Sequence, residues 1–260
     1  MKNKFLILGL VVSLLPGTIF AYTRPNNFMN LKGASRIAEI KKFQATLNVP
    51  VTGRIDDNTK KVLYNENVRV RDYVKAPTDG NWIVVNKSKR ILTMYTGDKV
   101  KYKFPVAVGT SKTPTPSAIG KIKNKHMNPA WGGMGGKYKP TSSDDPKNPL
   151  GERWMGLNLQ NFSGYGIHGT IKPHEIGRYV SNGCVRMFNY DIENYIFPNS
   201  KVGMPVYLGT DEELNSWGIA QYFEFIDKNT EAQVQNSNDK NVGTEKEKEK
   251  EYISGELLEY

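Results

Sequence analysis

The sequence predicts a mainly β protein that is preceded by a small α-helical module. Short runs of β-branched and aromatic residues, separated by turn residues, fill positions 79–110, which is typical of strands. Apolar residues at three- and four-residue steps occupy positions 34–68, which is typical of helices. With 260 residues, the chain has room for one such β domain and for smaller elements beside it.

The N-terminus has the layout of a secretory signal peptide. Two lysines precede an apolar run at residues 5–15, and Ala21 offers a small residue for cleavage. The run is about half of the ~20 residues that span a bilayer. An uncleaved anchor is the alternative, because Ile19, the third residue before the cut, is not small. We expect residues 1–21 to be a signal peptide and the protein to be exported, without a transmembrane span after cleavage.

Residues 34–68 predict two short helices. The first carries four apolar residues at helical spacing: Ile37, Ile40, Phe43 and Leu47. The second runs from about residue 56 to 64, and Asp56 is its expected N-cap, because a carboxylate can accept a hydrogen bond from the exposed amides of the first turn. A segment this short makes a small core, so we expect an accessory module.

The main domain is predicted to span residues 79–210 and to be mostly β. It opens with an antiparallel meander of three strands, at 82–86, 90–96 and 100–108. Residues 111–152 are rich in Pro, Gly, Lys and Asn, and a stretch of that length without a regular pattern predicts a lid or binding loop. Strands resume near 154–159, 164–168 and 204–208, and a short helix follows Asn189.

Charge divides the mature chain into a basic body and an acidic tail. Residues 22–210 hold 29 Lys and Arg against 13 Asp and Glu, whereas residues 211–260 hold 5 against 13. A basic body suits an anionic wall polymer or lipid head groups, and no zinc-finger or RNP-type pattern indicates nucleic acid. In the tail we expect a helix at 212–226 and then disorder, because residues 228–251 are almost all polar.

Cys184 is the single cysteine of the chain, so an internal disulfide is impossible. Exported proteins usually carry cysteines in pairs, and an unpaired thiol is open to oxidation outside the cell. Cys184 is therefore either buried and inert or kept for its chemistry. His168 is the candidate partner, because it ends an apolar strand between glycines, whereas His126 and His174 lie in polar stretches.

A histidine beside Cys184 would take the thiol proton, and the resulting imidazolium would lower the pKa of the thiol. Gly183 lets the backbone turn sharply before the cysteine, and the amides of Gly183 and Cys184 are expected to face a developing oxyanion. Ser181 would stabilise the turn or bond near the imidazole, and Arg186 would steady the loop or bind a substrate carboxylate. One cysteine and three scattered histidines show no zinc spacing, so we expect no metal.

These segments resemble the signature of L,D-transpeptidase (YkuD-type) catalytic domains. The resemblance is carried by His168-Gly169-Thr170, by Ile176-Gly177 and by the heptapeptide from Ser181 to Met187, and it extends over about residues 80–210. It implies a β-sandwich-like catalytic domain and no metal or organic cofactor. Asn182 departs from the family, in which histidine is frequent before the Gly-Cys pair, and residues 111–152 do not align contact by contact.

The resemblance also implies a reaction on peptidoglycan stem peptides. The cysteine attacks the carbonyl at the L-centre of the diamino acid in a stem tetrapeptide, D-alanine leaves, and an amine of another stem resolves the acyl-enzyme into a cross-link. Cys184 matches the nucleophile, His168 the base, and Gly169 the residue whose carbonyl orients the imidazole. The loop positions fall on Ser181, Gly183 and Arg186. The remaining substrate-binding candidates are Asn182, Thr170 and Trp131.

Residues 34–68 resemble the helical peptidoglycan-binding repeat, through Phe43-Gln44, Val51-Thr52-Gly53 and Ile55-Asp56. An ordinary helical spacer is the alternative. For the whole chain, two other functions stay open. A hydrolase of the same family would act as an L,D-carboxypeptidase or endopeptidase with the same residues, and a non-catalytic wall-binding protein would need only the helical module and the basic surface. Periplasm and cell wall are both compatible locations.

Overall fold

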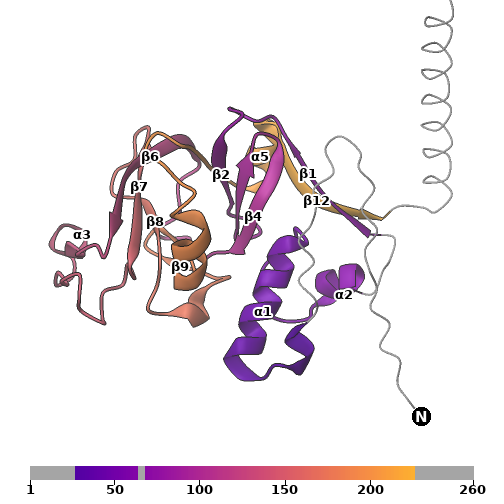
Figure 1. Cartoon of the computed structure of the whole chain (residues 1–260), viewed down its shortest axis with the longest axis horizontal. Coiled ribbons are helices and arrows are strands. Elements are labelled where there is room, and N and C mark those ends of the chain that lie inside the picture. The colour runs from indigo at the N-terminus through magenta and orange to yellow at the C-terminus, as the bar shows by residue number, and fades with distance from the viewer. Residues whose placement is uncertain (1–26, 64–67, 226–260) are drawn as a thin grey trace, which may run out of the picture. The chain divides into compact units, whose positions relative to one another are not determined.

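The computed structural model describes residues 27–63 and 68–225 (Figure 1). The predicted signal peptide, residues 1–21, and the polar tail beyond residue 225 lie outside the described residues. Among the helices that are described, none is both long and apolar enough to cross a membrane. The strands are β1 (Val68–Val74), β2 (Asn81–Asn86), β3 (Ile91–Thr96), β4 (Lys99–Pro105), β5 (Val108–Gly109), β6 (Ala118–Met127), β7 (Arg153–Leu159), β8 (Gly166–His168), β9 (Tyr179–Ser181), β10 (Val185–Arg186), β11 (Pro205–Gly209) and β12 (Ile219–Phe225).

The helices are short, apart from the first. They are α1 (Gly33–Thr46), α2 (Asp57–Leu63), α4 (Asn189–Asp191) and α5 (Asp211–Ser216), with single turns at η1 (Asn27–Asn30), η2 (Pro173–Glu175) and η3 (Ile192–Ile196). The element α3 (Gly133–Gly136) is a left-handed turn, in which even Met134 has a φ of 55°. The mainly β fold class is therefore confirmed, and a helix precedes the sheet as predicted.

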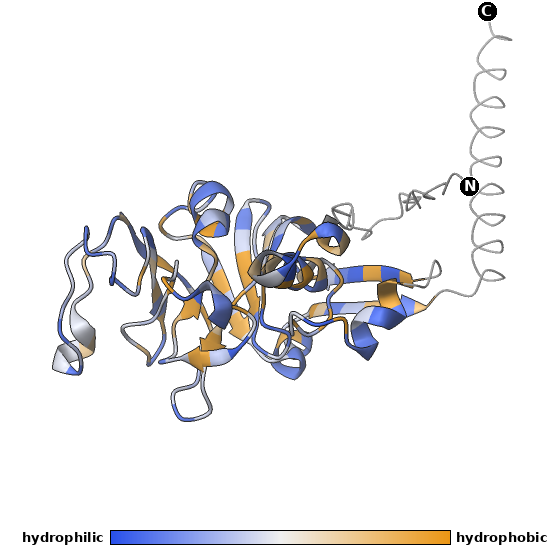
Figure 2. Cartoon of the chain, turned by 90° about the horizontal axis from the view of Figure 1, so that it is seen from below, coloured by the Kyte–Doolittle hydropathy of each residue, from blue (hydrophilic) through white to orange (hydrophobic). Residues whose placement is uncertain are grey.

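Eight strands form the central sheet, in the order β10-β8-β7-β6-β11-β2-β3-β4. The predicted meander β2-β3-β4 is confirmed as antiparallel. Two neighbouring pairs are parallel, β11 with β2 and β10 with β8. Phe104 of one edge strand and Val185 of the other belong to the same buried core, so the sheet curls around that core. Figure 2 shows the hydrophobic residues concentrated along the strands.

Strand β6 corrects the prediction that residues 111–152 lack regular structure. It pairs with β11 on one side and with β7 on the other. Its sequence hides this role, because Ile122 is its one buried apolar residue, whereas the apolar residues Ile119 and Met127 are exposed. A register shift between Ile122 and Asn124 further breaks the alternation that normally identifies a strand.

The predicted helix at residues 212–226 is also wrong in its second half. Helix α5 begins with a capping box between Thr210 and Glu213, as a helix of this sequence should. It ends at Ser216, and Gly218 has a φ of +77°, which a residue with a side chain seldom adopts. The chain then continues as the strand β12, where Ile219 and Gln221 are buried and Tyr222 is exposed.

The two predicted N-terminal helices are present, and Asp56 is the N-cap of α2, accepting a hydrogen bond from the Thr59 amide at 2.9 Å. The loop between the helices packs on the β domain. The amide of Val51 donates to Lys89 O at 3.0 Å, and the Arg90 guanidinium donates to Val51 O at 3.1 Å. Whether residues 34–68 form a peptidoglycan-binding module remains a prediction.

A buried ion pair lies under the meander. Lys103 Nζ is 2.5 Å from Asp72 Oδ1, and the two side chains are 6% and 1% exposed. Asn48 Oδ1 also accepts from Lys103, and Tyr95 donates its hydroxyl to Asp72 Oδ2 at 2.5 Å. Burial lowers the pKa of Lys103, although the Asp72 carboxylate opposes that shift. This network satisfies polar groups that would otherwise destabilise the interior.

We expect Asp72→Ala to lower the free energy of unfolding by about 3–5 kcal/mol, because it leaves the Lys103 ammonium buried without its counter-charge. Urea unfolding measures the change. The control is Lys60→Ala, which removes an exposed ion pair with Asp57 and should change stability by less than about 1 kcal/mol. Equal effects of the two substitutions would contradict the expectation.

Candidate active site

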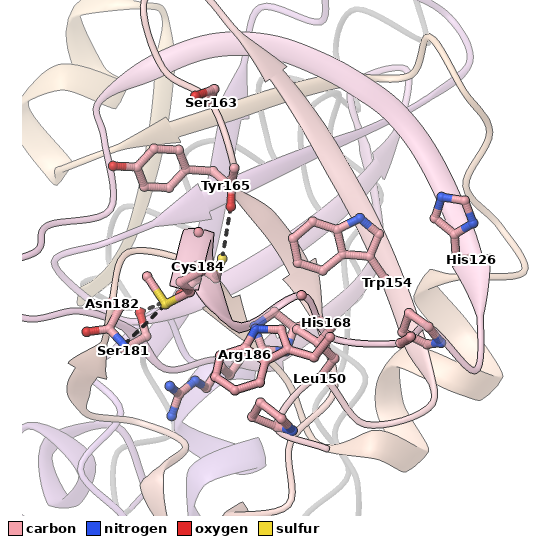
Figure 3. Close-up of a pocket in the computed structure, with 18 of the residues that line it drawn as sticks. His126, Leu150, Trp154, Ser163, Tyr165, His168, Ser181, Asn182, Cys184 and Arg186 are labelled. Atoms are coloured by element: carbon pink, nitrogen blue, oxygen red, sulfur yellow. Dashed lines mark hydrogen bonds between the residues drawn. The ribbon is translucent and has the colours of Figure 1, made fainter. Parts of the chain in front are cut away.

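One pocket of about 880 Å³ gathers most of the predicted site residues (Figure 3). His168 lies at the end of β8, and Cys184 lies one residue before β10. The two strands are parallel neighbours with Arg186 opposite His168, so the pairing brings the cysteine segment beside the histidine strand. The other predicted residues that line the pocket are Trp131, Ser181, Asn182 and Arg186.

His168 is fixed in orientation and in protonation state. It is 4% exposed, and its Nδ1 is 2.7 Å from Gly169 O, as the resemblance implied. Because a carbonyl oxygen only accepts, Nδ1 carries the proton and Nε2 is left as the basic nitrogen. The ring also stacks on Trp154, with 5.8 Å between the ring centroids. Burial, and secondarily the Arg186 charge, lower the pKa of His168 to about 4, so the imidazole is neutral at pH 7.

Cys184 is a neutral thiol in this environment. Its side chain lies 3.7 Å from Gly164 O, within reach of a weak S–H donor. Burial raises the pKa of the thiol, although the Gly166 backbone and Arg186 oppose the shift. The expected imidazolium–thiolate pair is therefore not the resting state, because burial disfavours both charges. A neutral imidazole in the same pocket as a neutral thiol can still act as a general base when substrate arrives.

Ser181 holds the turn before the cysteine. Its Oγ accepts from the Gly183 amide at 3.0 Å and donates to Cys184 O at 2.6 Å. Thr115 Oγ1 donates to Gly183 O at 2.7 Å, which fixes the same peptide from the other side. The expectation that the Gly183 amide faces an oxyanion is thus wrong, because that amide already bonds Ser181. The Cys184 amide is the remaining candidate.

Two further predicted residues have different settings. Asn182 reaches across the pocket, with Nδ2 3.5 Å from the Tyr138 hydroxyl, and Tyr138 in turn packs against Trp131 at 5.6 Å between ring centroids. Thr170 does not line the pocket. It is 5% exposed, and its amide donates to Asn189 Oδ1 at 2.7 Å, so its role is to hold the loop after β8. The predicted substrate contact of Thr170 is not supported.

Sequence reasoning missed three residues of this site. Trp154 lies opposite His168 in the β7–β8 pairing, Tyr165 packs against the Gly183 turn, and Glu175 pairs with Arg186. Glu175 Oε2 is 2.6 Å from Arg186 Nη1. The register of β7 against β8 brings Trp154 to His168, and the loop that carries Glu175 brings it to Arg186. A single sequence carries no signal for Glu175, whereas an aromatic residue on the strand before His168 could have indicated Trp154.

We expect Gly183→Ala to destabilise the protein by about 1–3 kcal/mol and to reduce turnover at least tenfold. Gly183 has a φ of +114°, and an added Cβ would lie 2.6 Å from Tyr165 Cε1, so the turn that carries Cys184 must shift. Gly203→Ala is the matched control, because its φ is +86° but a Cβ there meets nothing within 4 Å. Thermal unfolding and thiol-dependent turnover of both variants test this. Unchanged turnover in Gly183→Ala would contradict it.

Comparison with known proteins agrees with this geometry. The family model for the YkuD L,D-transpeptidase catalytic domain matches residues 80–208. YqjB of Bacillus subtilis, which carries the name L,D-transpeptidase, is 33% identical over 132 residues, covering 50% of this chain and 72% of YqjB. YkuD of the same organism is 36% identical over 110 residues, covering 42% of this chain and 55% of YkuD.

Among solved structures, a crystal structure of Enterococcus faecium L,D-transpeptidase aligns with a TM-score of 0.43 and 20% identity, covering 52% of this chain and 50% of that one. The curated relatives after YqjB are matched over about half of their own length. The family match and the YqjB relative together establish the assignment: the chain belongs to the L,D-transpeptidase family.

Proposed function

We propose that the chain is a peptidoglycan L,D-transpeptidase with Cys184 as nucleophile and His168 as general base. The observation that carries the proposal is the pairing of a neutral imidazole, whose Nε2 is its basic nitrogen, with the single thiol of the chain in one pocket. The thiol needs a base because it is uncharged at rest, and the imidazole is held by Gly169 O in the tautomer that can accept a proton.

The reaction then follows in two halves. His168 Nε2 takes the proton from Sγ as the sulfur attacks the carbonyl at the L-centre of the diamino acid, and the Cys184 amide donates to the oxyanion. The imidazolium returns that proton to the nitrogen of the leaving D-alanine, and a thioester remains. An amine of a second stem attacks the thioester, gives up its proton to His168, and forms the cross-link while Sγ is released as the thiol.

Residues 34–68 would support this reaction as a peptidoglycan-binding module. The loop between their two helices packs on the catalytic domain through Val51, so a bound glycan strand would be held close to the pocket. The proposed location, outside the cytoplasm in the periplasm or cell wall, rests on the signal-like N-terminus and on the family's substrate. Hydrolysis of the same bonds, as an L,D-carboxypeptidase or endopeptidase, is the alternative reaction, since it differs only in using water as acceptor.

Mass spectrometry of the purified chain with disaccharide tetrapeptide, with and without an amine acceptor, tests the proposal. The expected result is a tripeptide acyl adduct on Cys184 that the amine converts into a cross-linked dimer, and no adduct on Cys184→Ala. Release of D-alanine with free tripeptide as the only product would replace transfer by hydrolysis. A folded chain that gives neither adduct nor product would overturn catalysis and favour a wall-binding protein.

A further inference from the structure

The loop after His168 is bound at two points to the segment that leads into α4. The amide of Met187 donates to His168 O at 2.9 Å. The amide of Thr170 donates to the side-chain oxygen of Asn189 at 2.7 Å. These two bonds lie on either side of Gly169 along the chain. Asn189 does not line the pocket, so any effect that it has on the reaction must pass through the backbone that it holds.

One peptide group joins Asn189 to the imidazole. The Gly169–Thr170 peptide carries the carbonyl oxygen that lies 2.7 Å from His168 Nδ1, and it also carries the N–H that donates to Asn189 Oδ1. This peptide is trans and planar, so its C=O and N–H point in opposite directions and turn together. Holding the N–H therefore fixes the direction of the oxygen that accepts from Nδ1. The bond to Asn189 also polarises the peptide and makes that oxygen a stronger acceptor.

The side-chain oxygen of Asn189 lies between two glycines. A Cβ added at Gly169 would overlap Asn189 Oδ1, and one added at Gly151 would lie 2.7 Å from the same atom. Both positions are closer than ordinary van der Waals contact allows. The side chain of Asn189 can therefore approach this backbone only because neither neighbour carries a side chain.

The helical module holds α4 from another side. Lys42 Nζ on α1 is 3.5 Å from Asp191 Oδ1, and the Asp191 side chain is fully buried. The same ammonium lies over the ring of Phe188, 5.7 Å from its centroid. Asn189 stands between these two residues in the chain, so its position is set by contacts that need no substrate.

We propose that Asn189 is a positioning residue for His168, which acts through the Gly169–Thr170 peptide to keep the proton on Nδ1 and leave Nε2 as the base; this inference rests on the proposed function. A carbonyl oxygen only accepts, so a well-placed Gly169 O favours the Nδ1–H tautomer. Without Asn189 the peptide can turn, and the imidazole gains the tautomer with its proton on Nε2. That nitrogen then cannot accept the thiol proton. Removal of Asn189 should therefore lower the rate and leave the binding of stem peptide unchanged.

The tautomer is measured by long-range ¹H–¹⁵N correlation spectra of the ¹⁵N-labelled full chain at pH 7, with His168→Gln to identify the signals of His168. The native chain is expected to show the Nδ1–H tautomer, and Asn189→Ala a mixture of both. Acylation of Cys184 by disaccharide tetrapeptide should slow by about tenfold to a hundredfold with an unchanged KM, the range seen when the outer partner of a functional histidine is removed. Asn189→Asp keeps an oxygen that can accept from Thr170 and is expected to restore the Nδ1–H tautomer.

Asn194→Ala is the matched control. Asn194 lies in η3, which continues α4, and its side chain donates to Tyr190 O at 2.8 Å rather than to the loop after His168. The substitution removes the same carboxamide from the same segment and should change neither the tautomer nor the rate. If Asn189→Ala fails to fold, Asn189→Ser takes its place, because a hydroxyl one bond closer to the backbone cannot keep the 2.7 Å bond to Thr170.

The outcomes separate the positioning role from a merely structural one. A single Nδ1–H tautomer in Asn189→Ala overturns the proposal whatever the rate, and so does a mixed tautomer with an unchanged rate. An equal change in Asn194→Ala, or a change that Asn189→Asp does not reverse, overturns it as well. Because the tautomer is observed without substrate, a native chain that holds the Nδ1–H tautomer but forms no acyl adduct would overturn the proposed function alone.

Discussion

Replacing Cys184 with serine is expected to slow formation of the acyl-enzyme by at least about a thousandfold. The reason lies in the base. Burial holds the pKa of His168 at about 4, so its imidazole is a weak base, and it can assist a thiol far more readily than an alkyl hydroxyl. The substitution changes one atom of a half-buried side chain and leaves the Ser181–Gly183 turn in place. Stability is therefore expected to stay within about 1 kcal/mol.

The measurement is a single-turnover rate of adduct formation by mass spectrometry, on the native chain and on Cys184→Ser, with thermal unfolding of both as control. Alkylation of the native thiol by iodoacetamide gives a second readout. Since burial raises the pKa of Cys184, alkylation in the absence of substrate should be slow at pH 7 and accelerate as the pH rises past the usual thiol range. A serine variant within tenfold of the native rate would refute the role of the thiol.

The parts of this site that the sequence predicted are those that depend on neighbours along the chain. The segment from Ser181 to Arg186 is continuous, so its turn, its glycine and its single thiol are visible without a structure. The bond from His168 Nδ1 to Gly169 O is equally local, because it joins adjacent residues. The N-cap role of Asp56 belongs to the same class, since it depends on the residue three positions later.

The parts that the sequence could not supply depend on register or on burial. Trp154 faces His168 only because β7 and β8 pair in one register out of several. The neutral state of both proposed catalytic groups, His168 and Cys184, follows from desolvation, which no motif encodes. The Gly183 amide was expected to be available, yet Ser181 Oγ accepts its proton. Strand β6 was missed because Ile122 is its one buried apolar residue, whereas Ile119 and Met127 are exposed, so its sequence carries no regular apolar alternation.

His168→Gln is expected to remove a pH-dependent component of stability together with most of the catalysis. The pKa of His168 is about 4 in the folded protein and 6.5 as a reference for the unfolded chain. Between these values the unfolded chain binds the proton and the folded protein does not, so native stability falls as the pH drops from 6.5 to 4. A shift of that size corresponds to about 3 kcal/mol, fully present above pH 6.5 and lost by pH 4.

Urea unfolding at intervals between pH 4 and pH 7 measures this component. It is the difference between the native chain and His168→Gln in how the free energy of unfolding changes with pH. Between pH 7 and pH 4, the free energy of unfolding of the glutamine variant should fall by about 3 kcal/mol less than that of the native chain. Turnover of stem peptide at pH 7 should fall by about 10²–10⁴-fold through loss of the base. His174→Gln is the control, because His174 is exposed on the η2 turn and its removal should leave both the slope and turnover unchanged. Parallel pH profiles for the native and His168→Gln chains would mean that the imidazole is hydrated rather than buried. The neutral-base mechanism, which depends on a low pKa for His168, would then lose its physical basis even if turnover fell.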